Sequence, residues 1–404
     1  MVRLGAAIII AGVLVPATDA VALWDDKLEL FASQTLTRDD NVFRISSLVP
    51  AAVLGSSSKG DTYSTTSLGF NLDVPVSRQR FQGGVTWSKT RFDRFTILNW
   101  DGYQGQGTWL WQLGNDISGQ LGYTDTFVLA SLANIQSGVQ SSTPNFLTRR
   151  RAFFNAAYML TPRWRLRGEA GRFTQSNELP ARRLNDTGID SVDLTVSYVT
   201  PASNQIGFGV RAEDARLPNR EFVAGDFFDN SYRQQNVAAV ADWILGGSSR
   251  VNARVGSIRR SYAQLPQRDF EGATFHAGYD WSPTGKLILS ASAQKDISST
   301  EEILIGFVLV KGVALQPTLR LTDKLNIAAL LDYSDREYRS DPALVLAAVP
   351  NRTDHVRTAA VTISYRPIRT VALQMSLLHQ TRSSMVAFGD YAANVVSMSA
   401  RIGF

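Results

Sequence analysis

The sequence predicts an all-β fold: a transmembrane antiparallel β-barrel of roughly eighteen strands, with short periplasmic turns and longer extracellular loops. Three observations lead to this prediction. Residues 395–404 alternate between apolar and small or polar side chains and end on an aromatic residue. Tight turns and longer irregular segments alternate along the chain. The mean hydropathy of -0.09 is too low for a helical membrane protein, but it suits strands in which every second residue faces lipid.

The first 22 residues have the features of a secretory signal peptide. Arg3 supplies the positive start, and residues 4–15 form an apolar core that is too short to span a bilayer as a helix. Small residues at 20–22 offer a cleavage site, with cleavage after Ala20 as the second choice. We therefore expect a cleaved signal peptide (1–22) and one outer-membrane barrel (23–404) in a Gram-negative cell. A membrane anchor is the alternative, which the short core disfavours.

The composition narrows the classes of function. Cysteine is absent, which suits an oxidising envelope and excludes thiolate catalysis and cysteine-bound metals. The net charge is +5, from 41 basic and 36 acidic residues. Because the basic residues form no block, nucleic acid is not an expected partner. We also expect no cofactor.

Two kinds of connection alternate after the signal peptide. The tight turns carry Gly, Pro, Asn, Asp or Ser, as sharp reversals require, and lie at 75–78, 113–116, 161–163, 200–204, 246–249, 282–285, 321–324 and 366–369. The longer segments between them are 42–60, 131–147, 177–186, 218–230, 266–272, 298–307, 341–354 and 385–390. The connection at 96–100 is short and departs from this pattern. Bacterial barrels place the short turns in the periplasm and the long loops outside.

Between the connections, apolar residues share one parity, as in Leu68, Phe70, Leu72 and Val74. One face of each strand is therefore apolar and the other polar. Aromatic residues of the apolar parity gather beside the tight turns, as an interfacial girdle would: Trp111, Tyr158, Trp164, Tyr198, Trp243, Trp281 and Tyr365.

The sheet has to close, because a backbone in hydrocarbon cannot leave its N–H and C=O groups unpaired. We therefore expect the first strand, 28–36, to pair with the last, 395–404. Met398, Ile402 and Phe404 share the apolar parity of that last strand. A strand that ends on a terminal aromatic resembles the signal read by the barrel-assembly machinery. That machinery and the lipid or lipopolysaccharide of the outer membrane are the expected partners.

Arginines mark the polar parity. Arg163, Arg165 and Arg167 are spaced by two and so point the same way, and further arginines of this parity are Arg211, Arg254, Arg320 and Arg401. Along a water-filled lumen they would form an electropositive track for an anionic polymer or solute. Alternatively, they pair with carboxylates and stiffen the wall. The candidate carboxylates are Glu169, Asp193, Glu213, Asp242 and Asp280.

Histidine chemistry is the weakest candidate activity. The three histidines are His276, His355 and His379. A lipase-like site would need a histidine beside a serine, and His379 has Ser383 and Ser384 nearby in the sequence. A histidine at the membrane interface is the alternative, and we expect no enzymatic activity.

Asp39, Asp40 and Asn41 end the first predicted strand. Their side-chain oxygens would suit a divalent cation, but the spacing of a calcium loop is absent. The alternative is a turn in which Asp and Asn satisfy their own backbone, so no metal ion is expected.

Two N-terminal segments carry a family resemblance: Leu-Trp-Asp-Asp-Lys-Leu-Glu-Leu-Phe at 23–31 and Asp-Asp-Asn-Val-Phe-Arg at 39–44. Together they resemble the start of the EpsL-like outer-membrane proteins of exopolysaccharide biosynthesis operons, which are associated with exosortase systems. The resemblance implies a barrel that supports the assembly or export of an extracellular polysaccharide. It implies no catalytic residues.

The function expected from the sequence is therefore polysaccharide transit or secretion support, with loops such as 131–147 and 218–230 gating a polar, arginine-lined lumen. Polysaccharide and periplasmic export proteins would be its partners. The alternative is a general or solute-specific diffusion porin, and a further alternative is a scaffold with a plugged lumen.

Overall fold

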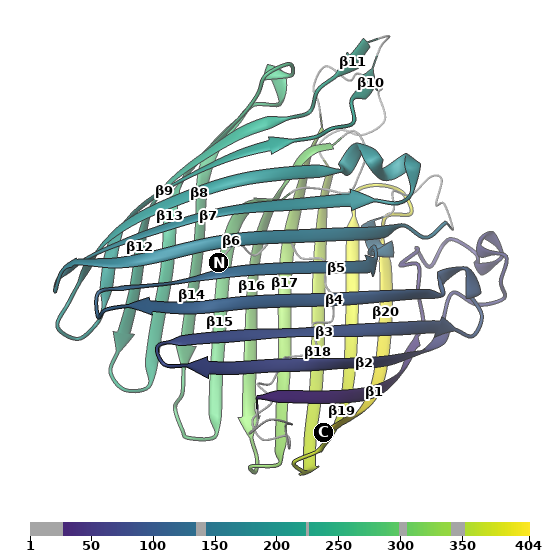
Figure 1. Cartoon of the computed structure of the whole chain (residues 1–404). Helices are drawn as coiled ribbons and strands as arrows, with labels where there is room; N and C mark the ends of the chain where they lie inside the picture. The colour runs from purple at the N-terminus through teal and green to yellow at the C-terminus, as the bar shows by residue number, and fades with distance from the viewer. Residues whose placement is uncertain (1–26, 135–142, 224–225, 299–304, 341–351) are drawn as a thin grey trace.

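The computed structural model describes residues 27–134, 143–223, 226–298, 305–340 and 352–404. The predicted signal peptide lies outside these residues. Nearly all of the described chain is β-strand, as Figure 1 shows, and the strands form one sheet of eighteen members that closes on itself. The predicted fold class and strand number are thus confirmed.

The barrel strands follow one another around the wall in chain order. They are β1 (Leu28–Asp39), β2 (Asp61–Val76), β3 (Gln79–Phe92), β4 (Trp100–Leu113), β5 (Ile117–Leu129), β6 (Phe146–Thr161), β7 (Trp164–Asn177), β8 (Thr187–Val199), β9 (Gln205–Arg216), β12 (Tyr232–Leu245), β13 (Ser249–Tyr262), β14 (Phe270–Trp281), β15 (Leu287–Ser298), β16 (Ile305–Arg320), β17 (Leu325–Ser340), β18 (Arg352–Ile368), β19 (Val371–Ser384) and β20 (Tyr391–Gly403). β9 pairs directly with β12, because β10 (Glu221–Val223) and β11 (Asp226–Phe228) form a separate hairpin in the loop between them.

The first and last barrel strands pair as predicted. The β1–β20 register runs from Phe31 opposite Gly403 to Asp39 opposite Val395. Leu30 N donates to Phe404 O at 3.0 Å, and Phe404 N donates to Leu30 O at 2.7 Å. These bonds leave no free sheet edge at the seam.

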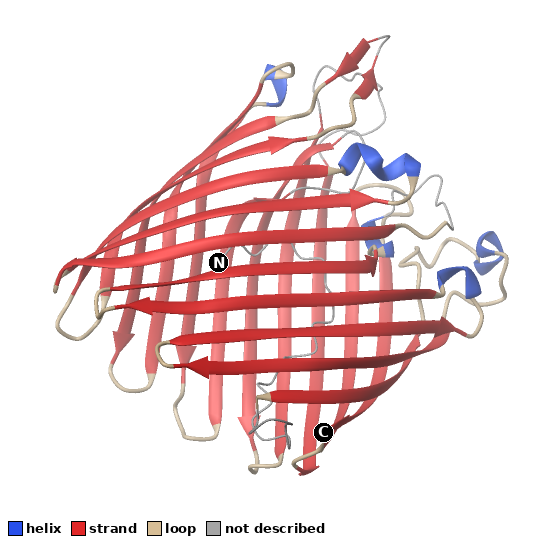
Figure 2. Cartoon of the chain, in the orientation of Figure 1, coloured by secondary structure: helices blue, strands red, loops and turns tan. Residues whose placement is uncertain are grey.

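The two ends of the barrel differ as the turn pattern predicts. Short turns join the strands at one end, whereas the other end carries the longer loops and all of the short 3-10 helices that Figure 2 draws in blue. These helices are η1 (Ala51–Leu54), η2 (Thr96–Leu98), η3 (Leu132–Asn134), η4 (Pro180–Asn185) and η5 (Pro266–Arg268). The short connection near residue 96 is therefore a loop of the extracellular end, built around η2. None of the helices in the described part of the chain has the length and apolarity of a membrane-spanning helix.

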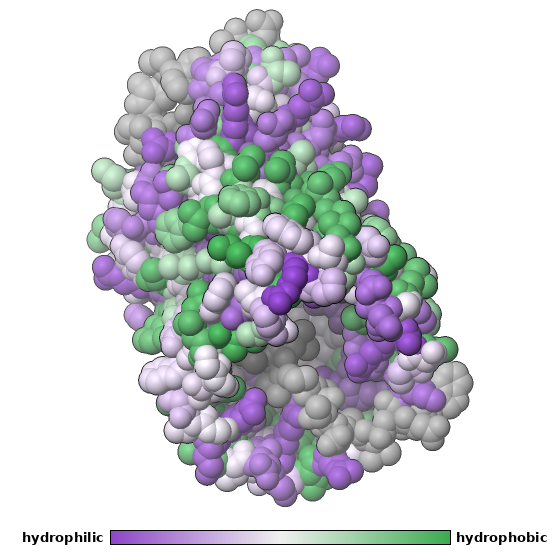
Figure 3. Space-filling model, turned by 90° about the vertical axis from the view of Figure 1, so that its left-hand side faces the viewer, coloured by the Kyte–Doolittle hydropathy of each residue, from purple (hydrophilic) through white to green (hydrophobic). Residues whose placement is uncertain are grey.

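The apolar parity faces outward. Large apolar side chains such as Trp87, Phe208 and Leu377 are exposed on the outer wall. Apolar side chains also gather across the middle of the face in Figure 3, below a hydrophilic upper region. Of the predicted girdle residues, Tyr158, Trp164, Tyr198, Trp243, Trp281 and Tyr365 are exposed at the ends of their strands beside the short turns. The opposite parity lines the interior.

Candidate functional site in the barrel lumen

Arginine–carboxylate pairs line the interior of the barrel. On β9, Arg211 Nε lies 2.7 Å from Glu213 Oε1. Arg254 of β13 reaches Asp193 of β8 at 3.3 Å. At the seam, Arg401 Nη2 lies 2.8 Å from Glu29 Oε1. A wall built from such pairs is polar, yet its field is weak because opposite charges lie side by side.

The Arg254 side chain lies along the wall and crosses two strands to reach Asp193. It passes Gly209, where an added Cβ would lie 3.6 Å from Arg254 Nη1 and only 2.7 Å from Thr195 Oγ1. The guanidinium then donates to Asn236 Oδ1 at 3.1 Å. The contact with Arg254 would be an ordinary one, so the glycine at position 209 makes room for the Thr195 hydroxyl rather than for the arginine.

The arginines around Glu169 outnumber their carboxylates. Arg151 Nη2 lies 3.5 Å and Arg167 Nη2 4.0 Å from the Glu169 carboxylate. Arg165 Nε approaches Met159 Sδ at 3.3 Å, and no carboxylate partner is present among the described residues. Arg163 lies in the turn before β7, so it is at the periplasmic rim rather than within a strand. This part of the lumen wall carries uncompensated positive charge.

The other predicted lumen arginine, Arg320, ends β16 at the periplasmic rim. Its side chain is exposed and has no ion-pair partner within the described chain. The candidate carboxylates Glu169, Asp193 and Glu213 are paired as above, and Asp242 pairs with Arg250. Asp280 instead accepts from Ser290 Oγ at 2.5 Å. The structure therefore combines both sequence hypotheses, with most arginines paired and a few unpaired near the periplasmic rim.

An apolar cluster fills one side of the extracellular mouth. It combines residues of the β1–β2 loop with the β3–β4 connection: Val42, Phe43, Ile45, Phe92, Phe95 and Leu98, all buried. Phe43 and Phe95 meet edge to face at 4.9 Å between ring centroids. Tyr63 packs against the cluster from the interior face of β2, and Leu132 packs against it from the β5–β6 loop. Two loops thus fold inward over the mouth.

The β5–β6 loop also reaches another part of the wall. Arg382 Nη1 of β19 donates to Ala133 O of η3 at 2.7 Å. The same guanidinium donates through Nε to Gly389 O at 2.7 Å and lies 4.7 Å from the Tyr391 ring. We call this contact between Arg382 and Ala133 the mouth latch. It brings Ala133 of η3 against β19, on another arc of the barrel.

The latch rests on a buried ionic cluster. The Asp354 carboxylate has no exposed surface and accepts from Arg352 Nε at 2.8 Å and from Ser384 Oγ at 2.5 Å. Arg382 Nε lies 4.0 Å from the same carboxylate. Arg352 and Arg382 are 4% and 7% exposed. A buried carboxylate between two buried guanidinium groups holds both side chains in place.

Sequence reasoning missed this cluster because it placed Arg352 and Asp354 in the predicted loop 341–354, whereas β18 begins at Arg352 and carries both residues on its inner face. Alternation alone does not distinguish a buried ion pair from a solvated one. The contact with Ala133 is invisible in the sequence, because a backbone carbonyl carries no side-chain signature.

The histidine candidates do not assemble into a catalytic site. His379 faces outward, and its Nδ1 lies 2.8 Å from Asn394 Oδ1. Ser384 faces the interior and is bonded to Asp354. Ser383 lies opposite His355 in the β18–β19 register. Ser384 and His379 therefore lie on opposite faces of the wall. Ser383 is on the same face as His379, but it stands opposite His355, and His379 is bonded to Asn394.

The acidic segment that ends β1 forms a turn. The Asp39 carboxylate accepts from Arg44 and, at 2.9 Å, from Asn41 N. The Asp40 carboxylate accepts from the backbone and side chain of Asn394, both at 2.7 Å. Protein donors therefore occupy these oxygens. The described residues contain no group of three or more side chains placed to hold a metal ion.

The closed eighteen-strand sheet, the apolar outer band and the charged interior define a porin-like β-barrel of the outer membrane. Residues 234–404, from β12 to the C-terminus, match the family model described as "Putative beta-barrel porin 2". No curated protein matches the chain.

Solved porin structures share the fold at low sequence identity. A BenF-like porin from Pseudomonas fluorescens Pf-5 is 11% identical, with a TM-score of 0.50 over 94% of this chain and 99% of that one. OpdK from Pseudomonas aeruginosa is 11% identical, with a TM-score of 0.50 over 93% and 99%. OccK2 (OpdF) from Pseudomonas aeruginosa, solved in complex with glucuronate, is 13% identical, with a TM-score of 0.48 over 94% and 98%.

Proposed function

We propose that the protein is a diffusion channel for small polar solutes, with a preference for anions. The observation that carries this proposal is the excess of arginine over carboxylate around Glu169, where Arg151 and Arg167 share one carboxylate and Arg165 has only a methionine contact. Paired charges offer hydrogen-bond donors and acceptors side by side along the wall. A hydrated solute can therefore exchange its hydrogen bonds as it moves, without binding tightly at any one point. The unpaired guanidinium groups then attract anions to the periplasmic half of the lumen.

The mouth supports a small solute rather than a folded or bulky one. The apolar cluster and the mouth latch hold two loops inward over the lumen. A solute that enters must pass between these loops and the wall. The predicted gating by loop 131–147 is thus part of the proposal. The described part of this loop includes Ala133, which contacts Arg382.

The selectivity is tested by replacing Arg163, Arg165 and Arg167 together with Ser. The reversal potential of single channels in a KCl gradient should shift away from anion preference. The Arg250→Ser, Asp242→Ser double variant is the control, because it removes a lumen pair at the periplasmic end without changing the net charge of the lumen. An unchanged reversal potential in the triple variant would remove the arginine track from the proposal.

A second candidate is support of exopolysaccharide export. The observation that favours it is the 39–44 segment, whose residues build the loop beside the mouth cluster. Under this proposal the barrel works with polysaccharide and periplasmic export proteins. Deletion of the gene would abolish polysaccharide secretion, and the purified barrel alone would show little conductance. Conductance without a partner, together with normal secretion in the deletion strain, favours the diffusion channel.

A further inference from the structure

The outer wall carries a hollow of about 920 Å³ across β13 to β19. Most of its lining residues belong to the outward parity, so the hollow opens toward lipid and not toward the lumen. Small side chains form its floor, and larger ones border it. The floor residues are Ala277, Ala291, Ala293 and Ala359, and the bordering residues include Tyr279, Leu315, Leu331 and Tyr333.

Basic side chains gather at the extracellular edge of this hollow. Lys295 and Lys311 are directly opposite in the β15–β16 register, an arrangement that is unfavourable unless an anion lies nearby. Lys311 pairs with Glu337, whereas Lys295 has no hydrogen-bond or ion-pair partner within the described chain. Arg357, which lines the hollow, is exposed, and its only described contact is with the Tyr333 ring at 5.9 Å.

The neighbouring carboxylates are already engaged. Glu337 is shared by Lys311 and Arg339, and Asp335 is hydrogen-bonded to His355, which adds a positive charge only when it is protonated. The cations Lys295, Lys311, Arg339 and Arg357 therefore outnumber the carboxylates Glu337 and Asp335, and no ion pair of Lys295 or Arg357 is present in the described chain. Long basic side chains can lie along an apolar surface and hold the charged group at the interface.

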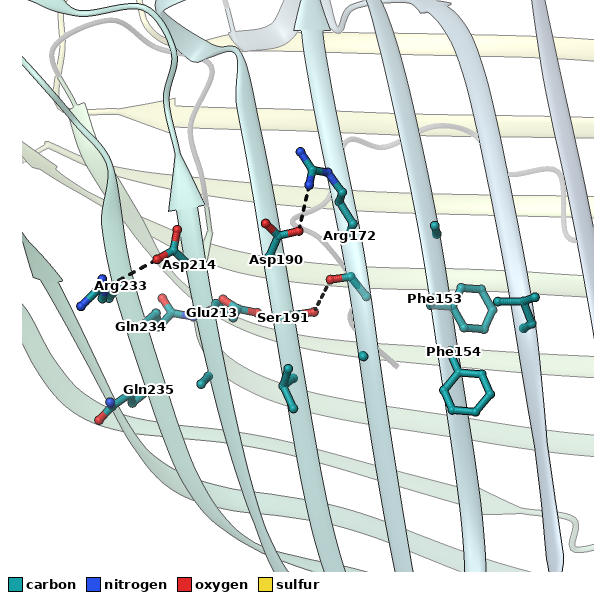
Figure 4. A pocket seen from close by; sticks show the side chains of 16 residues that line it. Phe153, Phe154, Arg172, Asp190, Ser191, Glu213, Asp214, Arg233, Gln234 and Gln235 are labelled. Carbon is teal, nitrogen blue, oxygen red and sulfur yellow. Dashed lines mark hydrogen bonds and ion pairs between the residues drawn. The ribbon is translucent and has the colours of Figure 1, made fainter.

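A second outer hollow, of about 720 Å³, provides a contrast (Figure 4). It also has an apolar floor, with Phe154 among its residues. Its polar rim, however, is internally paired: Arg172 lies 3.5 Å from Asp190, and Arg233 lies 3.4 Å from Asp214. This rim therefore presents less uncompensated charge to a ligand than the edge of the larger hollow does.

We propose that the larger hollow is a binding site for lipid A, the phosphorylated glycolipid of lipopolysaccharide. Its acyl chains lie over the alanine floor, and its two phosphate groups contact Lys295 and Arg357, which stand three strands apart on the wall. Guanidinium and ammonium groups are strong phosphate donors, and basic pockets on membrane proteins hold anionic headgroups. The cations lie at the end of the wall that carries the long loops, so the site faces the outer leaflet, where lipid A resides.

The charge of the edge argues against a second copy of this chain as the occupant. A copy would need exposed, unpaired carboxylates opposite Lys295 and Arg357. The outward carboxylates Asp190, Asp214 and Glu337 pair within their own chain, and the exposed Glu271 stands opposite Arg259 in the β13–β14 register. The proposal does not depend on the channel activity, because the hollow lies on the opposite face of the wall.

The test uses the full-length barrel, purified without lipopolysaccharide, with defined lipids added in detergent. Native mass spectrometry should detect a one-to-one complex with bis-phosphorylated lipid A, at least tenfold tighter than with dephosphorylated lipid A or phosphatidylglycerol. The Lys295→Gln, Arg357→Gln double variant should lose most of this difference. Arg38→Gln, Lys89→Gln is the matched control, since it removes two outward charges elsewhere on the wall and should bind as the wild type does.

A third variant tests the acyl part of the site. Ala293→Trp fills the floor of the hollow and should weaken lipid A binding, while heat-modifiable migration on gels reports that the barrel still folds. Equal binding of lipid A by the wild type and the double variant would overturn the proposal. Equal binding of phosphatidylglycerol and lipid A would also overturn it, as would a dimer of this chain that Ala293→Trp dissolves.

Discussion

The mouth latch is tested most directly by removing the guanidinium of Arg382. Arg382→Met keeps the length of the side chain and much of its packing against Tyr391, but it deletes the donors to Ala133 O and Gly389 O. The Asp354 carboxylate keeps its bonds from Arg352 and Ser384, so the substitution leaves no buried carboxylate without a donor.

The expected effect follows from the single bond between Arg382 and η3. A hydrogen bond from a charged donor contributes about 1.5–3 kcal/mol. A loss of about 2 kcal/mol shifts the equilibrium toward the detached loop by about 25-fold, since 1.4 kcal/mol corresponds to a factor of ten. The packing of Leu132 on the apolar cluster remains, so the loop should detach at the latch and stay attached at the cluster.

Single-channel recordings in planar bilayers provide the assay. The variant should enter a higher-conductance state more often than the wild type, because the detached loop leaves a wider mouth. Arg250→Met serves as the control, since it removes a lumen arginine at the periplasmic end, far from the loop. If Arg382→Met shows the same conductance levels and open-state noise as the wild type, the latch does not limit the mouth.

Two further predictions concern the seam and the mouth. Asn41→Ala removes bonds to Ile45 O (2.8 Å), Ile45 N (3.1 Å) and Ala392 O (2.9 Å). It should lower the free energy of unfolding in urea by about 1–3 kcal/mol, whereas the exposed Ser57→Ala should not change it. Deletion of Phe404 removes the terminal aromatic and its reciprocal bonds with Leu30. It should reduce the barrel in outer-membrane fractions several-fold on immunoblots, while Phe404→Tyr should assemble normally; normal levels after deletion would contradict a role in assembly.

The sequence was informative where local rules govern the fold. Alternation at positions such as Leu68 to Val74 fixes which face meets lipid, and tight turns fix where strands reverse. Closure follows from the cost of unpaired backbone groups in hydrocarbon, so the pairing of β1 with β20 was predictable. The strand number followed because each turn adds one strand and few turns were ambiguous.

The mouth was less predictable, because its contacts join distant parts of the chain. The acidic segment at 39–41 had two alternative interpretations, a cation site or a turn. The choice depended on Arg44 and Asn394, which supply the donors. Asn394 is brought to Asp40 only by closure of the barrel. Likewise, parity placed Arg211 and Arg254 in the lumen, but their partners depended on the register of the strands between them.

The two attachments at the mouth differ in how they can release a loop. The apolar cluster is close-packed and buries Ile45 and Leu98 almost completely, so opening it would expose a continuous apolar surface to water in the lumen. The latch is a single directional bond from a guanidinium that keeps its carboxylate neighbour when the bond breaks. Its release therefore leaves no unpaired buried charge, and water can solvate the freed Ala133 carbonyl. Movement of the β5–β6 loop should begin at Arg382 and turn about Leu132, so under the proposed channel function the gate would lie between β19 and this loop rather than over the apolar cluster.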